Sequence, residues 1–153
     1  MHRLLAVMAA LMMGSLLLAA APAGAAPPQA VDFTIEETIS PLTTGTLVTG
    51  SIPGCDDPTV FTENVRVGGG GSVQTFAGDK RFECANGDSF TLSFAARAVG
   101  CAATDAGSWR VVSATGGLTG LRGSGSLVGT YVGGDACGST GILDNYTGRF
   151  FLP

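Results

Sequence analysis

Several residue types that carry chemistry are scarce in this sequence of 153 residues. The single histidine is His2, and all four methionines lie among the first 13 residues. Lysine occurs once, as Lys80, and charged residues make up only 13 % of the chain. Beyond the N-terminal segment, this composition excludes Ser-His-Asp triads, histidine-ligated metals and histidine proton relays, so we expect neither a metal nor a cofactor.

The first 25 residues have the pattern of a secretory signal peptide. Arg3 provides the basic start, residues 4–21 are almost wholly apolar, and Ala23-Gly24-Ala25 fits the small-x-small cleavage site. The alternative is a transmembrane helix, because the apolar run approaches the spanning length of about 20 residues, but no basic residue stops it. We therefore expect cleavage, secretion to the extracellular space, and no membrane association of the mature chain.

The chain is acidic. Its 8 basic and 12 acidic residues give a formal net charge of −4 at pH 7, and the loss of Arg3 with the leader would leave 7 against 12. Proteins that bind nucleic acids usually carry a basic patch, so we expect no nucleic-acid partner.

Residues 31–153 have the pattern of one all-β domain, after a short Pro/Ala linker at residues 26–30 that we expect to be disordered. Short β-rich runs alternate with Gly, Pro, Asn and Asp, and none has helical periodicity. In the clearest run, Phe90 and Phe94 alternate with Ser89 and Ser93, which predicts one buried face. The predicted strands are Val31–Ile39, Thr44–Ile52, Thr59–Val67, Val73–Cys84, Asp88–Val99, Ser108–Thr115, Gly123–Val132 and Thr140–Leu152.

Eight short strands with short connections favour an antiparallel up-and-down order. Closure of such a sheet removes its exposed edges, so the sequence predicts an eight-stranded barrel, with an eight-stranded sandwich as the alternative. A barrel of this size can fill itself with side chains or hold one small ligand. The mixture of bulky and small residues at the expected inward positions leaves both arrangements open.

The four cysteines, Cys55, Cys84, Cys101 and Cys137, predict two disulfides in an exported chain. Successive turns of an up-and-down sheet lie at alternate ends, which places the first two cysteines at one end and the last two at the other. A strand of about 11 residues separates the ends by roughly 35 Å, whereas a disulfide needs Cα atoms within about 7 Å. We therefore predict Cys55–Cys84 and Cys101–Cys137, and the lack of a C-x-x-C motif disfavours a zinc site.

A glycine-rich segment surrounds and follows the only tryptophan. Residues 107–112 have the sequence GSWRVV, residues 115–116 TG and residues 120–125 GLRGSG. No lysine or predicted helix follows these glycines, so they are not a phosphate-binding loop. The pattern resembles the central signature of the allene oxide cyclase barrel-like superfamily, and more closely its small exported actinobacterial proteins of unassigned function. Gly117 and Leu118 replace the usual variable-aromatic pair of that signature.

The resemblance implies an eight-stranded antiparallel barrel, in agreement with the strand count. The enzymes of that superfamily cyclise a fatty-acid epoxide, and the related dirigent proteins steer radical coupling. No residue here matches a catalytic motif of either group, so the resemblance supplies no site residues.

Three acidic residues fall at predicted inward positions. Alternation places Glu37 on the apolar face of the first strand, Glu63 on the face of Phe61 and Val65 in the third, and Asp144 on the apolar face of the last. Burial raises the pKa of a carboxyl and lets it act as an acid or a base, so these three are the candidate catalytic residues. The alternative is structural, because a β-bulge would reverse the register and turn such an acid towards solvent.

Other side chains are candidates for the wall of a cavity rather than for chemistry. Lys80 follows Gly78-Asp79, where we predict a bulge, and we do not expect it to act as a Schiff-base lysine. The aromatic candidates for the wall of a cavity are Trp109, Tyr131, Tyr146, Phe90 and Phe94.

Three function classes follow from these expectations. The first is a structural module or one that binds a small apolar ligand. The second is a cofactor-independent cyclase or isomerase that uses an inward carboxylate. The third is a protein-binding or inhibitor module acting through its loops. A large apolar pocket containing one of the three acids would favour the enzyme. A cavity without titratable groups would favour ligand binding, and a filled barrel would favour the third class.

Overall fold

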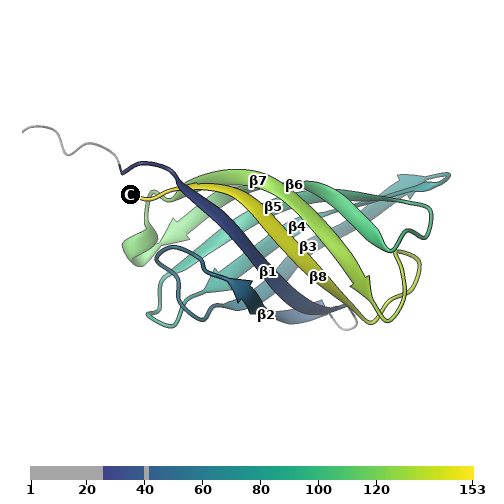
Figure 1. Cartoon of the computed structure of the whole chain (residues 1–153), viewed down its shortest axis with the longest axis horizontal. Coiled ribbons are helices and arrows are strands. Elements are labelled where there is room, and N and C mark those ends of the chain that lie inside the picture. The colour runs from purple at the N-terminus through teal and green to yellow at the C-terminus, as the bar shows by residue number, and fades with distance from the viewer. Residues whose placement is uncertain (1–25, 40–41) are drawn as a thin grey trace, which may run out of the picture.

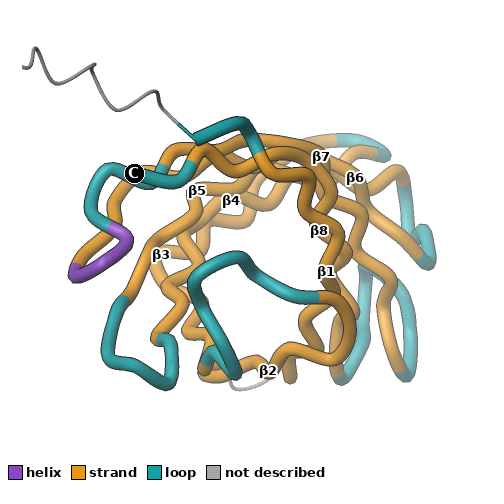
Figure 2. The backbone as a smooth tube through the Cα atoms, turned by 60° about the vertical axis from the view of Figure 1, so that its left-hand side comes forward, coloured by secondary structure: helices purple, strands orange, loops and turns teal. Residues whose placement is uncertain are grey.

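The structure, a computed structural model, describes residues 26–39 and 42–153, and these form one closed antiparallel barrel (Figures 1 and 2). Each strand pairs with the next along the chain, and the last closes the sheet by pairing with the first. A single turn of 3-10 helix, η1 (Gly116–Leu118), lies between the sixth and seventh strands. The strands are β1 (Gln29–Ile39), β2 (Leu42–Gly50), β3 (Thr59–Gly70), β4 (Val73–Glu83), β5 (Ser89–Val99), β6 (Thr104–Thr115), β7 (Arg122–Val132) and β8 (Gly141–Phe151).

The prediction of an eight-stranded up-and-down barrel is confirmed, and the strand bounds agree within a few residues. The largest differences are at β6, which begins four residues before the predicted Ser108, and at β3, which ends three residues after the predicted Val67; β1 begins two residues early, at Gln29. Gln29 and Ala30 pair with Phe150 and Arg149, so the last two residues of the predicted linker belong to the sheet. The predicted signal peptide lies outside the described residues.

One end of the barrel is filled with aromatic side chains. Phe33 stacks on Tyr146 with ring centroids 5.0 Å apart, and Phe82 stacks on Phe90 at 4.6 Å. Trp109 packs edge-on against Phe150 at 5.5 Å, and its indole N–H donates to two backbone carbonyls of the barrel wall. Burial of each such ring stabilises the fold by about 1.5–3 kcal/mol.

A bulge in β3 overturns part of the predicted orientation. Glu63 pairs with Asp79 and Arg66 with Ala77, so β3 has one residue more than β4 between these pairs. Asn64, within the bulge, has φ of +54°. One extra residue shifts the two-residue alternation by one position. Odd-numbered residues of β3 therefore point to one face of the sheet before the bulge and to the other face after it.

The expectation that Glu63 faces inward is therefore wrong. Its carboxylate lies outside the barrel, 3.0 Å from Arg81 Nε, and Phe61 lies outside with it, against the same guanidinium. The predicted bulge at Gly78-Asp79 is also misplaced, because β4 pairs with β5 in unbroken register.

Both disulfides form as predicted, one at each end of the barrel. Cys55–Cys84 joins the β2–β3 and β4–β5 connections, and Cys101–Cys137 joins the β5–β6 and β7–β8 connections. The Cα atoms of each pair are 5.0 Å apart. Among the described residues, no helix is long and apolar enough to span a membrane.

Candidate functional site

The barrel is hollow at the end that carries the Cys101–Cys137 disulfide. A cavity of about 270 Å³ lies there, close to the lower limit of small-molecule sites. Its apolar wall includes Val65, Phe76, Phe94, Leu127 and Ile142, which come from five different strands. The barrel is thus divided into a filled half and a hollow half.

A buried ion cluster forms the polar part of the cavity. Lys80 Nζ lies 2.5 Å from Glu37 Oε2 and 2.7 Å from Asp144 Oδ2, and all three side chains are at most 5 % exposed. Thr62 donates to the other Glu37 oxygen over 2.9 Å. Strands β1, β4 and β8 therefore meet through one ammonium group, and Phe94 covers it with its ring centroid 5.2 Å from Nζ.

The electrostatics of the cluster keep Lys80 charged. Burial alone would lower the pKa of this amine, but the charges of Asp144 and Glu37 outweigh that effect and raise the pKa above its ordinary value. A Schiff-base lysine needs a lowered pKa, so the surroundings of Lys80 agree with the expectation that it is not a nucleophile.

A third carboxyl, Asp105 on β6, extends the cluster along the wall. Its Oδ2 accepts from the Tyr131 hydroxyl over 2.8 Å, and its Oδ1 accepts from the Gly129 backbone N–H over 3.1 Å. Burial raises the pKa of Asp105, and the nearby negative charge of Asp144 raises it further. No basic side chain pairs directly with this carboxyl within residues 26–39 and 42–153.

The position of Gly129 shows how closely two carboxylates approach. A Cβ atom at this position would lie 2.5 Å from Asp105 Oδ1 and 2.8 Å from Asp144 Oδ1. Ile142 Cδ1 lies 2.6 Å from the same point, so only a residue without a side chain fits between these groups.

Tyr146 on β8 belongs to the aromatic core and lies next to the cluster. Its hydroxyl is the only buried side-chain polar atom of the described chain that lacks a hydrogen-bond partner. Burial raises the pKa of Tyr146 far above its ordinary value, and the negative charges of Asp144, Glu37 and Asp105 add to the shift, as does the proximity of the hydroxyl to the Asp144 carboxylate. A buried hydroxyl without a partner is costly, typically by about 1–3 kcal/mol.

The structure brings some of the predicted site residues together and separates others. Glu37 and Asp144 do point inward and meet at Lys80, and two of the five predicted wall aromatics, Phe94 and Tyr131, line the cavity. The other three do not line it, because they pack in the aromatic core at the filled end. These are Trp109, Tyr146 and Phe90.

Sequence reasoning missed two members of the cluster, although a signal for each was present. Asp105 precedes the predicted start of the sixth strand, but it lies four positions before the inward-facing Trp109. An even spacing along one strand places both side chains on the same face. Lys80 lies two positions before the buried Phe82 and so shares its face of β4. The bulge predicted at Gly78-Asp79 kept Lys80 from being placed on that face.

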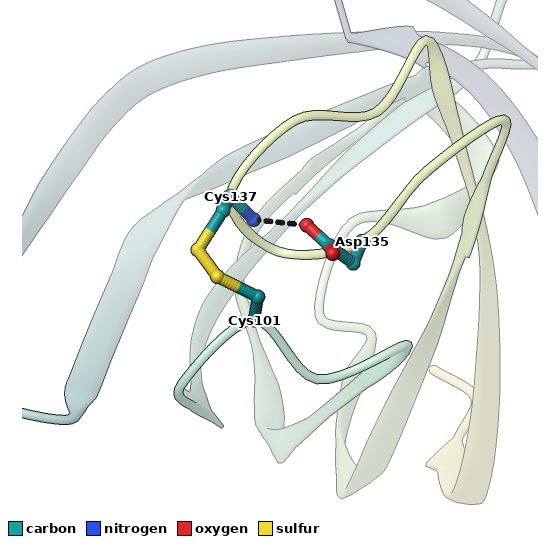
Figure 3. Close-up of side chains that lie close together, drawn as sticks. All are labelled: Cys101, Asp135 and Cys137. Carbon is teal, nitrogen blue, oxygen red and sulfur yellow. Dashed lines mark hydrogen bonds between the residues drawn. A yellow bond between two sulfur atoms is a disulfide. The ribbon is translucent and has the colours of Figure 1, made fainter.

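A second group of possible ligand atoms lies at the rim of the hollow end. Cys101, Asp135 and Cys137 gather there, as Figure 3 shows. The two sulfur atoms are bonded to each other and are therefore not thiolates, and Asp135 Oδ1 accepts from the Cys137 backbone N–H over 2.8 Å. This group stabilises the β7–β8 loop and does not offer a metal the thiolate ligands it would need.

No protein-family model, curated protein or solved structure matches the chain.

Proposed function

We propose that this protein is a binding module whose barrel holds one small, largely apolar molecule. The observation that carries the proposal is the cavity of about 270 Å³, in which an apolar wall surrounds a few convergent polar groups. That combination is typical of small-molecule sites. A filled barrel would have favoured a protein-binding module instead. Glu37 and Asp144 do lie in the pocket, but both are paired with Lys80, so we place binding before catalysis.

We also retain export and membership of the allene oxide cyclase barrel-like superfamily as proposals. Two disulfides support an oxidising compartment, and the closed eight-stranded barrel is the fold that the resemblance implies. N-terminal sequencing of protein secreted by its own host tests the export proposal, with residue 26 expected as the first residue. A protein that keeps residues 1–25 would contradict it.

The binding proposal is tested by filling the cavity from within. Ala96 lines the cavity on β5, and its neighbour Ala95 is exposed outside the barrel. We expect Ala96→Leu to abolish binding of two probes, 3-phenylpropylamine and 3-phenylpropan-1-ol, while the matched control Ala95→Leu binds both as the wild type does. Binding is followed by NMR titration, and circular dichroism verifies that both variants fold.

Native mass spectrometry of protein purified from its own host complements this test, because it detects a co-purified natural ligand. The proposal is wrong if neither probe binds and the purified protein carries no molecule. It is also wrong if Ala96→Leu leaves binding unchanged.

A second candidate function is acid–base catalysis in a cofactor-independent isomerase or cyclase. Asp105 favours it, because this carboxyl has a raised pKa, lines the cavity and has no cationic partner among the described residues. The predicted candidates Glu37 and Asp144 suit that role less well, since Lys80 holds both. The test is to incubate the co-purified molecule with fresh protein: conversion that Asp105→Asn abolishes while binding persists supports catalysis, and an unchanged molecule contradicts it.

A further inference from the structure

The charge of the cavity points to the class of molecule that fits it. Glu37, Asp105 and Asp144 contribute three carboxyl groups, whereas Lys80 is the only basic residue in the described lining. Both the Lys80–Glu37 and the Lys80–Asp144 pairs are almost fully buried. One ammonium among three carboxyl groups leaves a net negative charge, whether Asp105 is ionised or protonated.

The excess charge lies on the side of the cluster away from Lys80. The Oδ1 atoms of Asp105 and Asp144 both lie close to Gly129, whereas Lys80 contacts the opposite oxygen of Asp144. The point beside Gly129 is itself closed, since Ile142 also crowds it, so a ligand group reaches the two carboxyl groups from the cavity that both residues line. Two carboxylate oxygens that converge in an apolar cavity form a place for a positively charged hydrogen-bond donor. A carboxylate there would be repelled by both.

The unpartnered Tyr146 hydroxyl is an independent indication that the cluster is incomplete. It is fully buried, and it lies in the aromatic core beside the Asp144 carboxylate rather than in the cavity wall. Buried polar atoms normally have a partner, so an unpartnered hydroxyl beside the cluster indicates that the hydrogen bonding of the cluster is incomplete.

We propose that the ligand of this barrel carries a protonated amino group, which binds between Asp105 and Asp144, with its apolar body against the wall of the cavity. This inference rests on the proposed binding function. It selects against fatty acids, whose carboxylate would meet the negative end of the site.

The test compares three probes with one carbon skeleton and different head groups: 3-phenylpropylamine, 3-phenylpropan-1-ol and 3-phenylpropanoic acid. At pH 7 we expect calorimetric or NMR titration to show the amine binding at least about tenfold more tightly than the alcohol. The acid is expected not to bind measurably. High salt should weaken amine binding only slightly, because the charges are buried.

Two variants locate the interaction. Asp105→Asn removes one carboxylate but keeps an acceptor for Tyr131, and we expect it to lose most of the preference for the amine. Glu63→Gln removes a carboxylate from the outer surface and should leave all three affinities unchanged.

The inference is overturned if the alcohol or the acid binds as tightly as the amine, or if Asp105→Asn keeps the full preference. Those results would leave the binding function standing. If none of the three probes binds and the purified protein carries no molecule, the binding function and the inference fail together. A co-purified ligand without an amino group would overturn the inference alone.

Discussion

At the residue scale, Lys80 neutralises part of a buried negative charge. Replacing one partner of a buried ion pair leaves the other charges without compensation, which typically costs about 3–5 kcal/mol. Exposed pairs contribute far less, about 0–1 kcal/mol. The adjacent residues Lys80 and Arg81 permit a direct comparison, since the first pairs inside the barrel and the second outside it.

We expect Lys80→Met to lower the free energy of unfolding by about 3–5 kcal/mol, because Glu37 and Asp144 would stay buried without a cation. The control Arg81→Met should lower it by at most about 1 kcal/mol. Urea denaturation followed by tryptophan fluorescence measures both. Equal losses for the two variants would contradict the assigned role of Lys80.

Asp105 gives the stability a distinctive dependence on pH. Its pKa is raised above the ordinary value of 3.8 in the folded state, so folded protein keeps a proton that the unfolded chain has already released. Unfolding therefore releases a proton in this window, and the contribution of Asp105 to stability decreases as pH rises from about 4 through the raised pKa.

Asp105→Asn removes this titration, so we expect the variant to gain stability relative to the wild type between pH 4 and pH 7. Urea denaturation at both pH values measures the change. The control Tyr131→Phe keeps the carboxyl and should keep the decline, which extends to higher pH because the Tyr131 hydrogen bond lowers the pKa of Asp105. The effect is refuted if the free energies of unfolding of the wild type and of Asp105→Asn differ by the same amount at pH 4 and at pH 7.

At the element scale, the sequence predicted regular strands well and irregular ones poorly. β5 alternates without interruption, so the faces of Phe90 and Leu92 followed directly from a period of two. In β3, the bulge at Asn64 reverses the pattern, and Val65 lines the cavity although Glu63 does not. A bulge depends on pairing with β4, which local sequence does not encode.

The same limit explains the candidate site. Inward carboxylates can be found from the alternation of side chains along a single strand, as Glu37 and Asp144 were. Their meeting at Lys80 depends on the relative stagger of β1, β4 and β8, which closure of the barrel fixes.

β7 shows how one position without a side chain makes room for the site. We expect Gly129→Ala to destabilise the barrel by about 1–3 kcal/mol, because the new Cβ would collide with Asp105, Asp144 and Ile142. Gly70→Ala on β3 is the matched control, since no atom lies within 4 Å of its Cβ position, and its effect should stay within about 0.5 kcal/mol. Thermal and urea unfolding test the pair, and similar losses would show that the space beside Gly129 is not tight.

At the scale of the whole molecule, the two ends have different roles. The aromatic end is packed and stabilises the fold, whereas the other end holds the cavity and the ion cluster. Each end has its own disulfide, so the two bonds can be removed separately. Their sequence separations of 29 and 36 residues are similar, and in the chain-entropy model each contributes about 3–4 kcal/mol.

We expect the double variant Cys101→Ser/Cys137→Ser to lose both stability and binding of 3-phenylpropylamine, because Cys137 and its loop line the cavity. Cys55→Ser/Cys84→Ser is the matched control: it should lose a similar amount of stability but keep its affinity while folded. Titration below the unfolding temperature separates the two effects. Equal weakening of binding in both variants would contradict the division of roles.

The burial of the only lysine has a practical consequence for chemical labelling. Lys80 is 2 % exposed, so an acylating reagent does not reach its amine while the barrel is closed. This amine can be acylated only when the barrel opens. The rate at which a peptide containing acylated Lys80 accumulates therefore reports how often the barrel opens, with no engineered probe.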